Sequence, residues 1–105
     1  MQAICIRFFA QEGMKHAHQL VHEWLFQQAG ELGIPGGTVF RAAAGFGRHG
    51  ALEDAFFELA GTLPESIEFA ADAARIAALI ERVGAAGLKL VYVTHPVTTG
   101  VTGQA

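Results

Sequence analysis

The strongest local signal in the chain is residues 33–50, which read GIPGGTVFRAAAGFGRHG. Glycine and proline at 33–37 end a helical pattern, and Thr38 and Val39 then open a β-branched run that is typical of a strand. Three glycines within 45–50 allow the backbone to turn sharply and to approach a ligand closely. The stretch therefore predicts a helix end, a strand and a glycine-rich loop.

The residues before this stretch predict one strand and one helix. Residues 3–9 are apolar on both faces, which favours a central strand. A helix follows after Gly13, with apolar residues recurring at three- and four-residue intervals until Gly33. These residues are Leu20, Val21, Trp24, Leu25, Ala29 and Leu32.

The second half of the chain repeats this order after a long irregular segment. Residues 65–71 alternate and predict a strand, with Ile67, Phe69 and Ala71 facing inward. Asp72 can cap a helix that ends at Gly84 and whose inner face carries Ile76, Leu79, Ile80 and Val83. Residues 88–94 predict the last strand, which we expect to end at Pro96.

The predicted order is βαββαβ, with strands at 3–9, 38–44, 65–71 and 88–94. This order predicts an α+β, ferredoxin-like domain: an antiparallel sheet with two helices on one face. The other face is apolar and needs a cover, which we expect to be further copies of the chain. We expect a domain over 1–96, with a loop at 47–63, and a flexible tail over 97–105.

The bulk properties limit the partners. A chain of 105 residues allows one domain, and a net charge of -3 with scattered Lys and Arg argues against nucleic acid. No window is apolar enough to span a membrane, and no secretory leader is recognisable, so we expect a cytoplasmic protein. The single cysteine, Cys5, lies in an apolar strand, which favours a small buried residue over a reactive thiol.

Residues that could carry chemistry are sparse. The sole serine, Ser66, and Cys5 lie in predicted strands with no neighbouring base, so we expect no enzyme. His18 and His22 are four residues apart on the first predicted helix, a spacing at which two imidazoles can share a metal ion. The alternative is that both histidines border the apolar stripe of that helix.

The glycine-rich motif resembles the start of the T-loop in the PII signal-transduction family, and more closely a family of uncharacterised PII-like proteins. The residues that carry the resemblance are Gly33, Ile34, Gly36 or Gly37, Thr38, Val39, Arg41, Gly45, Phe46, Gly47, Arg48 and His49, with Leu63 and Pro64 before the third strand. The resemblance implies a homotrimer with an adenine nucleotide in each cleft between subunits, and a T-loop that contacts a target.

Residue by residue, the resemblance implies that the nucleotide contacts Thr38, Gly45, Phe46, Gly47 and Arg48. Lys89 is the nearby cation on the last strand, and we add it to this set. For the partner-binding loop we select His49, Glu53, Phe56 and Phe57, of which the two phenylalanines either anchor the loop or contact the partner.

The chain departs from typical PII proteins in two ways. Residues 84–87 are short and uncharged, and no arginine follows the last strand, so we expect ADP or AMP to be favoured over ATP. The loop has no tyrosine, so regulation by uridylylation cannot be carried over. A second effector could be bicarbonate, 2-oxoglutarate or a metal.

The sequence thus predicts a PII-like signalling protein that regulates a membrane transporter or a metabolic enzyme through its T-loop. Two alternatives stay open. One is a metal-homeostasis trimer, similar to the CutA proteins, that uses His18 and His22. The other is a scaffold trimer that binds no small molecule.

Overall fold

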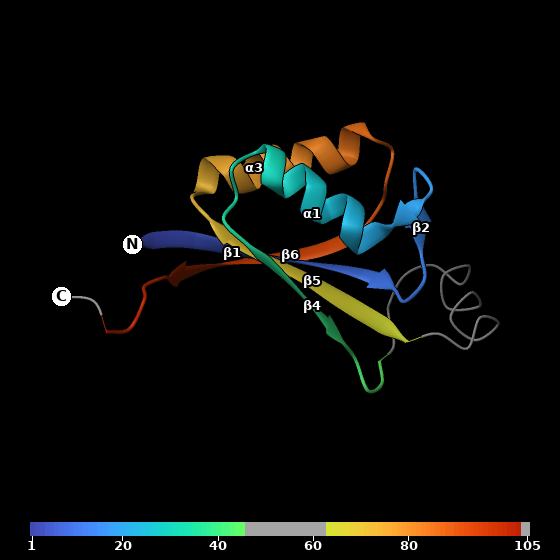
Figure 1. Cartoon of the computed structure of the whole chain (residues 1–105), viewed down its shortest axis with the longest axis horizontal. Coiled ribbons are helices and arrows are strands. Elements are labelled where there is room, and N and C mark those ends of the chain that lie inside the picture. Colours follow the sequence, from blue (N-terminus) through green and yellow to red (C-terminus); the bar gives the residue numbers. More distant parts are fainter. Residues whose placement is uncertain (46–62, 104–105) are drawn as a thin grey trace.

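The sheet of this protein has four antiparallel strands in the order β4-β5-β1-β6, and both helices cover one of its faces (Figure 1). The computed structural model describes residues 1–45 and 63–103. The four strands are β1 (Gln2–Gln11), β4 (Gly37–Arg41), β5 (Pro64–Ala71) and β6 (Val91–Thr98). This order confirms the predicted ferredoxin-like βαββαβ fold.

The core lies between the sheet and the two helices. Alternate residues of the central strands point toward the helices, and Ile6, Phe8 and Ile67 are at most 1% exposed. Helix α1 (Val21–Glu31) buries Val21, Trp24, Leu25 and Ala29, whereas α3 (Ala73–Ala85) buries Ile76, Leu79 and Val83. The apolar faces predicted for β5 and for the second helix are therefore confirmed.

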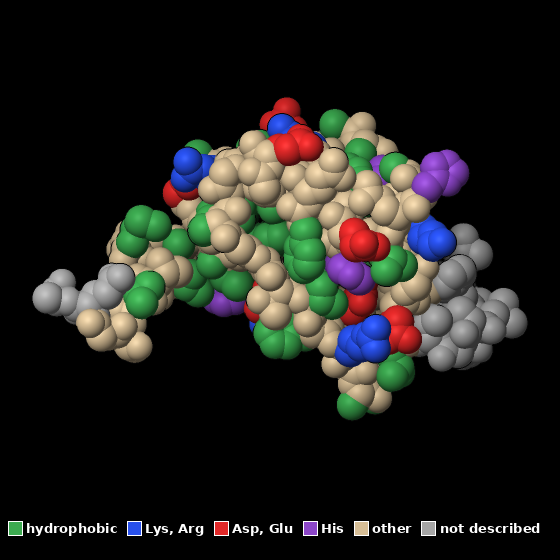
Figure 2. Space-filling model, in the orientation of Figure 1, with side chains coloured by type: hydrophobic (Ala, Val, Ile, Leu, Met, Phe, Trp, Pro, Cys, Tyr) green, Lys and Arg blue, Asp and Glu red, His purple; other side chains and the backbone are tan. Residues whose placement is uncertain are grey.

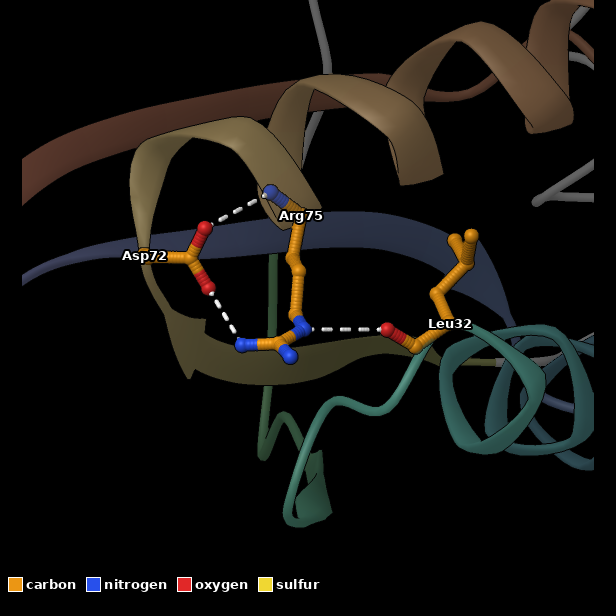
Figure 3. A network of polar contacts seen from close by, with 3 residues as sticks. All are labelled: Leu32, Asp72 and Arg75. Atoms are coloured by element: carbon orange, nitrogen blue, oxygen red, sulfur yellow. Dashed lines mark hydrogen bonds and ion pairs between the residues drawn. The ribbon is translucent and has the colours of Figure 1, made fainter.

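One polar network fixes the beginning of α3 against the end of α1 (Figure 3). The Asp72 carboxylate accepts a hydrogen bond from the backbone N–H of Arg75, which confirms the predicted cap. The Arg75 guanidinium donates to the same carboxylate at 2.8 Å and to the carbonyl of Leu32 at 3.1 Å. The Arg75 side chain, chiefly through its hydrogen bond, lowers the pKa of Asp72 from its ordinary value.

The first helix starts later than predicted. A small hairpin of β2 (Lys15–His16) and β3 (Gln19–Leu20) precedes α1, and its two turn residues have left-handed φ angles, 51° at Ala17 and 67° at His18. The prediction that His18 and His22 share one helix is therefore wrong: His18 lies in the hairpin turn and His22 in the first turn of α1. The helical spacing that suggested a shared metal ion does not exist.

The last strand is shifted toward the C-terminus relative to the prediction. Strand β6 starts at Val91 and continues to Thr98, so Pro96 lies inside it instead of ending it. Because β6 is an edge strand, alternate N–H groups point away from its only neighbour, and a proline is tolerated there. Leu88 and Leu90 pack against the core before the strand begins.

The sheet face opposite the helices is largely apolar and has no cover from the described residues. By register, the alternation of the strands places Phe9, Phe40, Val91 and Val93 on this open face. Phe40 is 52% exposed, and Val91 and Val93 are 43% exposed. Figure 2, which views the two layers from the side, shows hydrophobic side chains at the surface along the strand layer. No helix of the described chain is long and apolar enough to span a membrane.

Candidate functional site

A broad hollow of about 1200 Å³ lies at the end of the sheet where β4 stops and β5 starts. Its rim includes Ala44 and Gly45, the last described residues before position 46, and Pro64, the second residue after position 62. Two backbone hydrogen bonds hold this end of the sheet together, from Ala42 N–H to the Pro64 carbonyl and from Glu12 N–H to the Leu63 carbonyl, both 3.0 Å. The hollow thus adjoins both ends of the segment 46–62.

The walls of the hollow are mainly apolar and come from both layers. The open face of the sheet contributes Phe9, Phe40, Val91 and Val93, and the helix side contributes Ile80, Val83, Leu88 and Leu90. Ligand sites in proteins commonly combine such apolar walls with a few polar groups, in clefts of roughly 300 to 1,000 Å³. The hollow is therefore large enough for a nucleotide.

Three cations line the hollow, and two of them already have partners. The Arg7 Nε donates to Glu68 at 2.9 Å, and Arg41 pairs with Glu12 at 3.4 Å. Lys89 is exposed and forms no ion pair with the described residues. Of these three cations, only Lys89 has no ion-pair partner among the described residues. Its whole side chain is therefore available to an anionic ligand.

A buried carboxylate lies at the start of β5, beside the hollow. Glu65 is 4% exposed, and its Oε1 lies 3.4 Å from the Nδ1 of His22 on α1. In the sheet register Glu65 stands opposite Arg41. His22 therefore has a structural partner here. Among the described residues, no group of three or more His, Cys, Asp or Glu side chains is arranged to hold a metal ion.

Gly45 is required by packing at the rim. A Cβ atom at this position would lie 2.9 Å from Cγ of Pro64, closer than real Cβ atoms approach a neighbour. Gly45, the first residue of the GFGR motif, therefore allows the backbone after β4 to approach Pro64 at the rim of the hollow. This contact gives a structural reason for the residue, in addition to its predicted contact with a ligand.

The structure brings together only part of the predicted nucleotide site. Gly45 and Lys89 both line the hollow, whereas Thr38 lies on the open face, one pleat from the hollow-lining Phe40, and does not line it. Phe46, Gly47, Arg48, His49, Glu53, Phe56 and Phe57 lie outside the described residues. Their predicted roles stay predictions.

The structure also adds a residue that the sequence analysis did not select. Arg7 lines the hollow from the open face of β1, where it stands opposite Val93 of β6 on one side and Glu68 of β5 on the other. The available signal was a single arginine in an apolar, alternating strand, at an odd position that faces away from the helices.

Cys5, two residues earlier on the same face, is half-buried. Burial, and secondarily the Glu68 carboxylate, raises the pKa of its thiol, whereas Arg7 lowers it.

Comparisons with known proteins identify the family and the fold of this chain. The model of the family DUF190, described as "Uncharacterized ACR, COG1993", matches residues 3–99. A UPF0166 protein from Aquifex aeolicus (strain VF5) is 29% identical over 79 residues, which cover 74% of this chain and 75% of that protein.

Two solved structures of CPII from Thiomonas intermedia K12, a nitrogen regulatory PII-like protein, share the fold. The first, bound to ADP, AMP and acetate, has a TM-score of 0.65 and 20% identity over 95% of this chain and 90% of that chain. The second, bound to ADP, AMP and bicarbonate, has a TM-score of 0.63 and 18% identity over 96% of each chain. Since the family match spans nearly the whole sequence, the chain belongs to the DUF190 family and has the PII-like fold that its glycine-rich motif predicted.

Proposed function

We propose that this chain is a regulatory protein that binds an adenine nucleotide in the hollow, and that a neighbouring subunit of a homotrimer completes the site. The observation that carries the proposal is the position of the hollow, which adjoins both ends of the segment 46–62 through Gly45 and Pro64 and is also lined by Lys89. CPII, which shares the fold at 18 to 20% identity, was solved with ADP and AMP. The function proposed is a sensor, with no reaction of its own.

A second subunit follows from the open face. A broad hollow with one apolar wall on an uncovered sheet leaves a nucleotide exposed to water on one side. If copies of the chain pack their open faces together, they cover Phe40 and Val93 and close that side. The proposed nucleotide site therefore lies between subunits.

The charges favour a nucleotide with few phosphates. Each phosphate adds negative charge that the protein must match with cations or backbone N–H groups. Lys89 is the unpaired cation among the described lining residues, and Arg48 is the further cation that the motif supplies. Two cations match AMP or ADP better than ATP.

Calorimetric titration with AMP, ADP and ATP tests the proposal. AMP or ADP should bind at least as tightly as ATP, and Arg48→Ala should weaken the nucleotide with more phosphates by the larger factor. Arg82→Ala is the matched control, because Arg82 pairs with Glu31 and does not line the hollow. Absence of binding for all three nucleotides would reduce the family likeness to one of fold alone.

The output of the sensor is proposed to be the loop 47–63. By analogy with PII proteins, His49, Glu53, Phe56 and Phe57 would contact a cytoplasmic target, either a membrane transporter or a metabolic enzyme. A second effector, most simply bicarbonate, is proposed because CPII was solved with bicarbonate and with acetate. Affinity capture with the wild-type chain and with a Phe56→Ala, Phe57→Ala variant, each with and without ADP, would identify the target.

A further inference from the structure

The open face carries one polar group of side chains in the middle of its apolar surface. Arg7 of β1 and Glu68 of β5 stand opposite each other in the sheet register, and the Arg7 Nε lies 2.9 Å from Glu68 Oε2. Thr38 of β4 stands opposite Glu68, and Ser66 is the next residue of β5 on this face. Two charges and two hydroxyl groups thus lie together on three adjacent strands.

Most of the hydrogen-bonding capacity of Arg7 is unused by the described residues. A guanidinium has five N–H donors, and in this structure only Nε donates, to Glu68. The two terminal amino groups make no hydrogen bond to the described part of the chain. In the single chain the Arg7 side chain is 39% exposed, and because it lines the hollow a small ligand that enters the hollow between subunits can reach these donors.

The surroundings select the charge and the shape of that ligand. Glu68 largely cancels the charge of Arg7, so a multiply charged anion such as phosphate would be repelled by the nearby carboxylate. A monoanion can accept hydrogen bonds from the two amino groups of Arg7 with less repulsion from Glu68. A planar group with two oxygens matches the paired N–H donors of a guanidinium. Phe9 and Val93 flank Arg7 along β1 and across from it on β6, which lowers the polarity around such a contact.

We infer that Arg7, oriented by Glu68, forms a binding site for a planar monoanion, a carboxylate or bicarbonate, on the open-face wall of the hollow. This inference rests on the proposed function, because it gives the second effector a location. Arg7 binds the anion, whereas Glu68 holds the guanidinium in place and at the same time weakens binding through its charge.

The two partners of the ion pair therefore have opposite effects on affinity, and this contrast is the test. Acetate and bicarbonate are titrated separately into the wild-type protein at constant ionic strength, and the side-chain Nε–H resonance of Arg7 or backbone resonances of β1 are followed by NMR. We expect saturable shifts. Arg7→Gln should weaken binding roughly tenfold or more, the value of one charge-assisted contact. Glu68→Gln should strengthen it severalfold, and Arg82→Gln should leave it unchanged.

A purely structural role for the pair predicts something different. Both variants would then lower the melting temperature and weaken anion binding to a similar extent, and that result would overturn the inference. NMR shifts that never saturate would overturn it as well. Tighter binding of phosphate than of acetate would contradict the ligand class. ADP binding without saturable acetate or bicarbonate binding would overturn this site alone, whereas anion binding without any nucleotide binding would overturn the proposed function alone.

Discussion

Gly37 and Gly36 are neighbours in the motif, and the structure distinguishes them. A Cβ atom on Gly37 would lie 2.5 Å from Cε1 of Phe69 and 3.0 Å from Cε1 of Phe26, whereas one on Gly36 would meet nothing within 4 Å. Phe69 is 2% exposed, so its ring has little room to move. We expect Gly37→Ala to lower the free energy of unfolding by about 1 to 3 kcal/mol, the usual cost of overpacking, in urea titrations.

Gly36→Ala is the matched control for this prediction, and it should change stability by no more than a surface substitution does. Equal effects of the two substitutions would show that the loss of a glycine, and not the contact with Phe69, determines the result.

Asp72 couples the stability of the α3 cap to pH. The Arg75 side chain lowers the pKa of Asp72 below its ordinary value of 3.8, so the folded protein favours the carboxylate. The resulting stabilisation is complete above pH 3.8 and is lost as the pH falls through the folded-state pKa. Asp72→Asn should therefore be less stable than wild type in urea at neutral pH, and the two curves should converge in strong acid.

The Arg75→Gln background checks the cause of that effect. Because Arg75 supplies the main interaction with Asp72, the Asp72→Asn substitution should cost less there at neutral pH. The same cost in both backgrounds would mean that Arg75 is not the source of the pKa shift.

At the level of single residues, the sequence predicted only some of the residues that line the hollow. Gly45 could be found because glycine has a specific backbone role, and Lys89 because it is the only charged residue in the apolar stretch 88–94. Arg7 was missed because its role depends on Glu68, which is 61 residues away in sequence and adjacent only in the folded sheet. Side-chain pairs across strands are set by register, and register is not readable from one strand alone.

The β2–β3 hairpin is an element that stores backbone strain. Ala17 and His18 both have left-handed φ angles, a geometry that Asn-Gly adopts in two-residue hairpin turns with little cost. The double substitution Ala17→Asn, His18→Gly should raise the free energy of unfolding by about 1 kcal/mol, measured by thermal or urea unfolding. Ala77→Gly on the exposed side of α3 should instead lower it by about 1 kcal/mol. A destabilised hairpin variant would show that Ala17 or His18 makes a contact that offsets the strain.

The long strands and the helix α3 could be predicted from the sequence, whereas the two-residue strands could not. The strands at β1 and β5 and the helix α3 have enough residues to show a period, and Asp72 marks the start of α3. The strands β2 and β3 have two residues each, too few for any period, and their turn lacks glycine and asparagine. The apolar spacing of α1 therefore predicts a helix that begins too early and includes His18.

For the whole molecule, assembly depends on the open face. We expect sedimentation equilibrium to give a trimer of the 11.1 kDa chain, and Phe40→Lys to dissociate it because a charge without a partner would be buried between the open faces. Val101→Lys is the control, since Val101 is 69% exposed and lies beyond β6, outside the sheet. A wild-type monomer at micromolar concentration would remove the second subunit from the nucleotide site.

A crystal structure of the protein with ADP would show whether an adenine nucleotide binds in the hollow between subunits. We expect three copies around a threefold axis, with one ADP per chain in contact with Gly45 and Lys89 of one subunit and with residues of its neighbour. ADP bound away from this hollow, or bound within it without any contact from a second subunit, would contradict the proposed site between subunits.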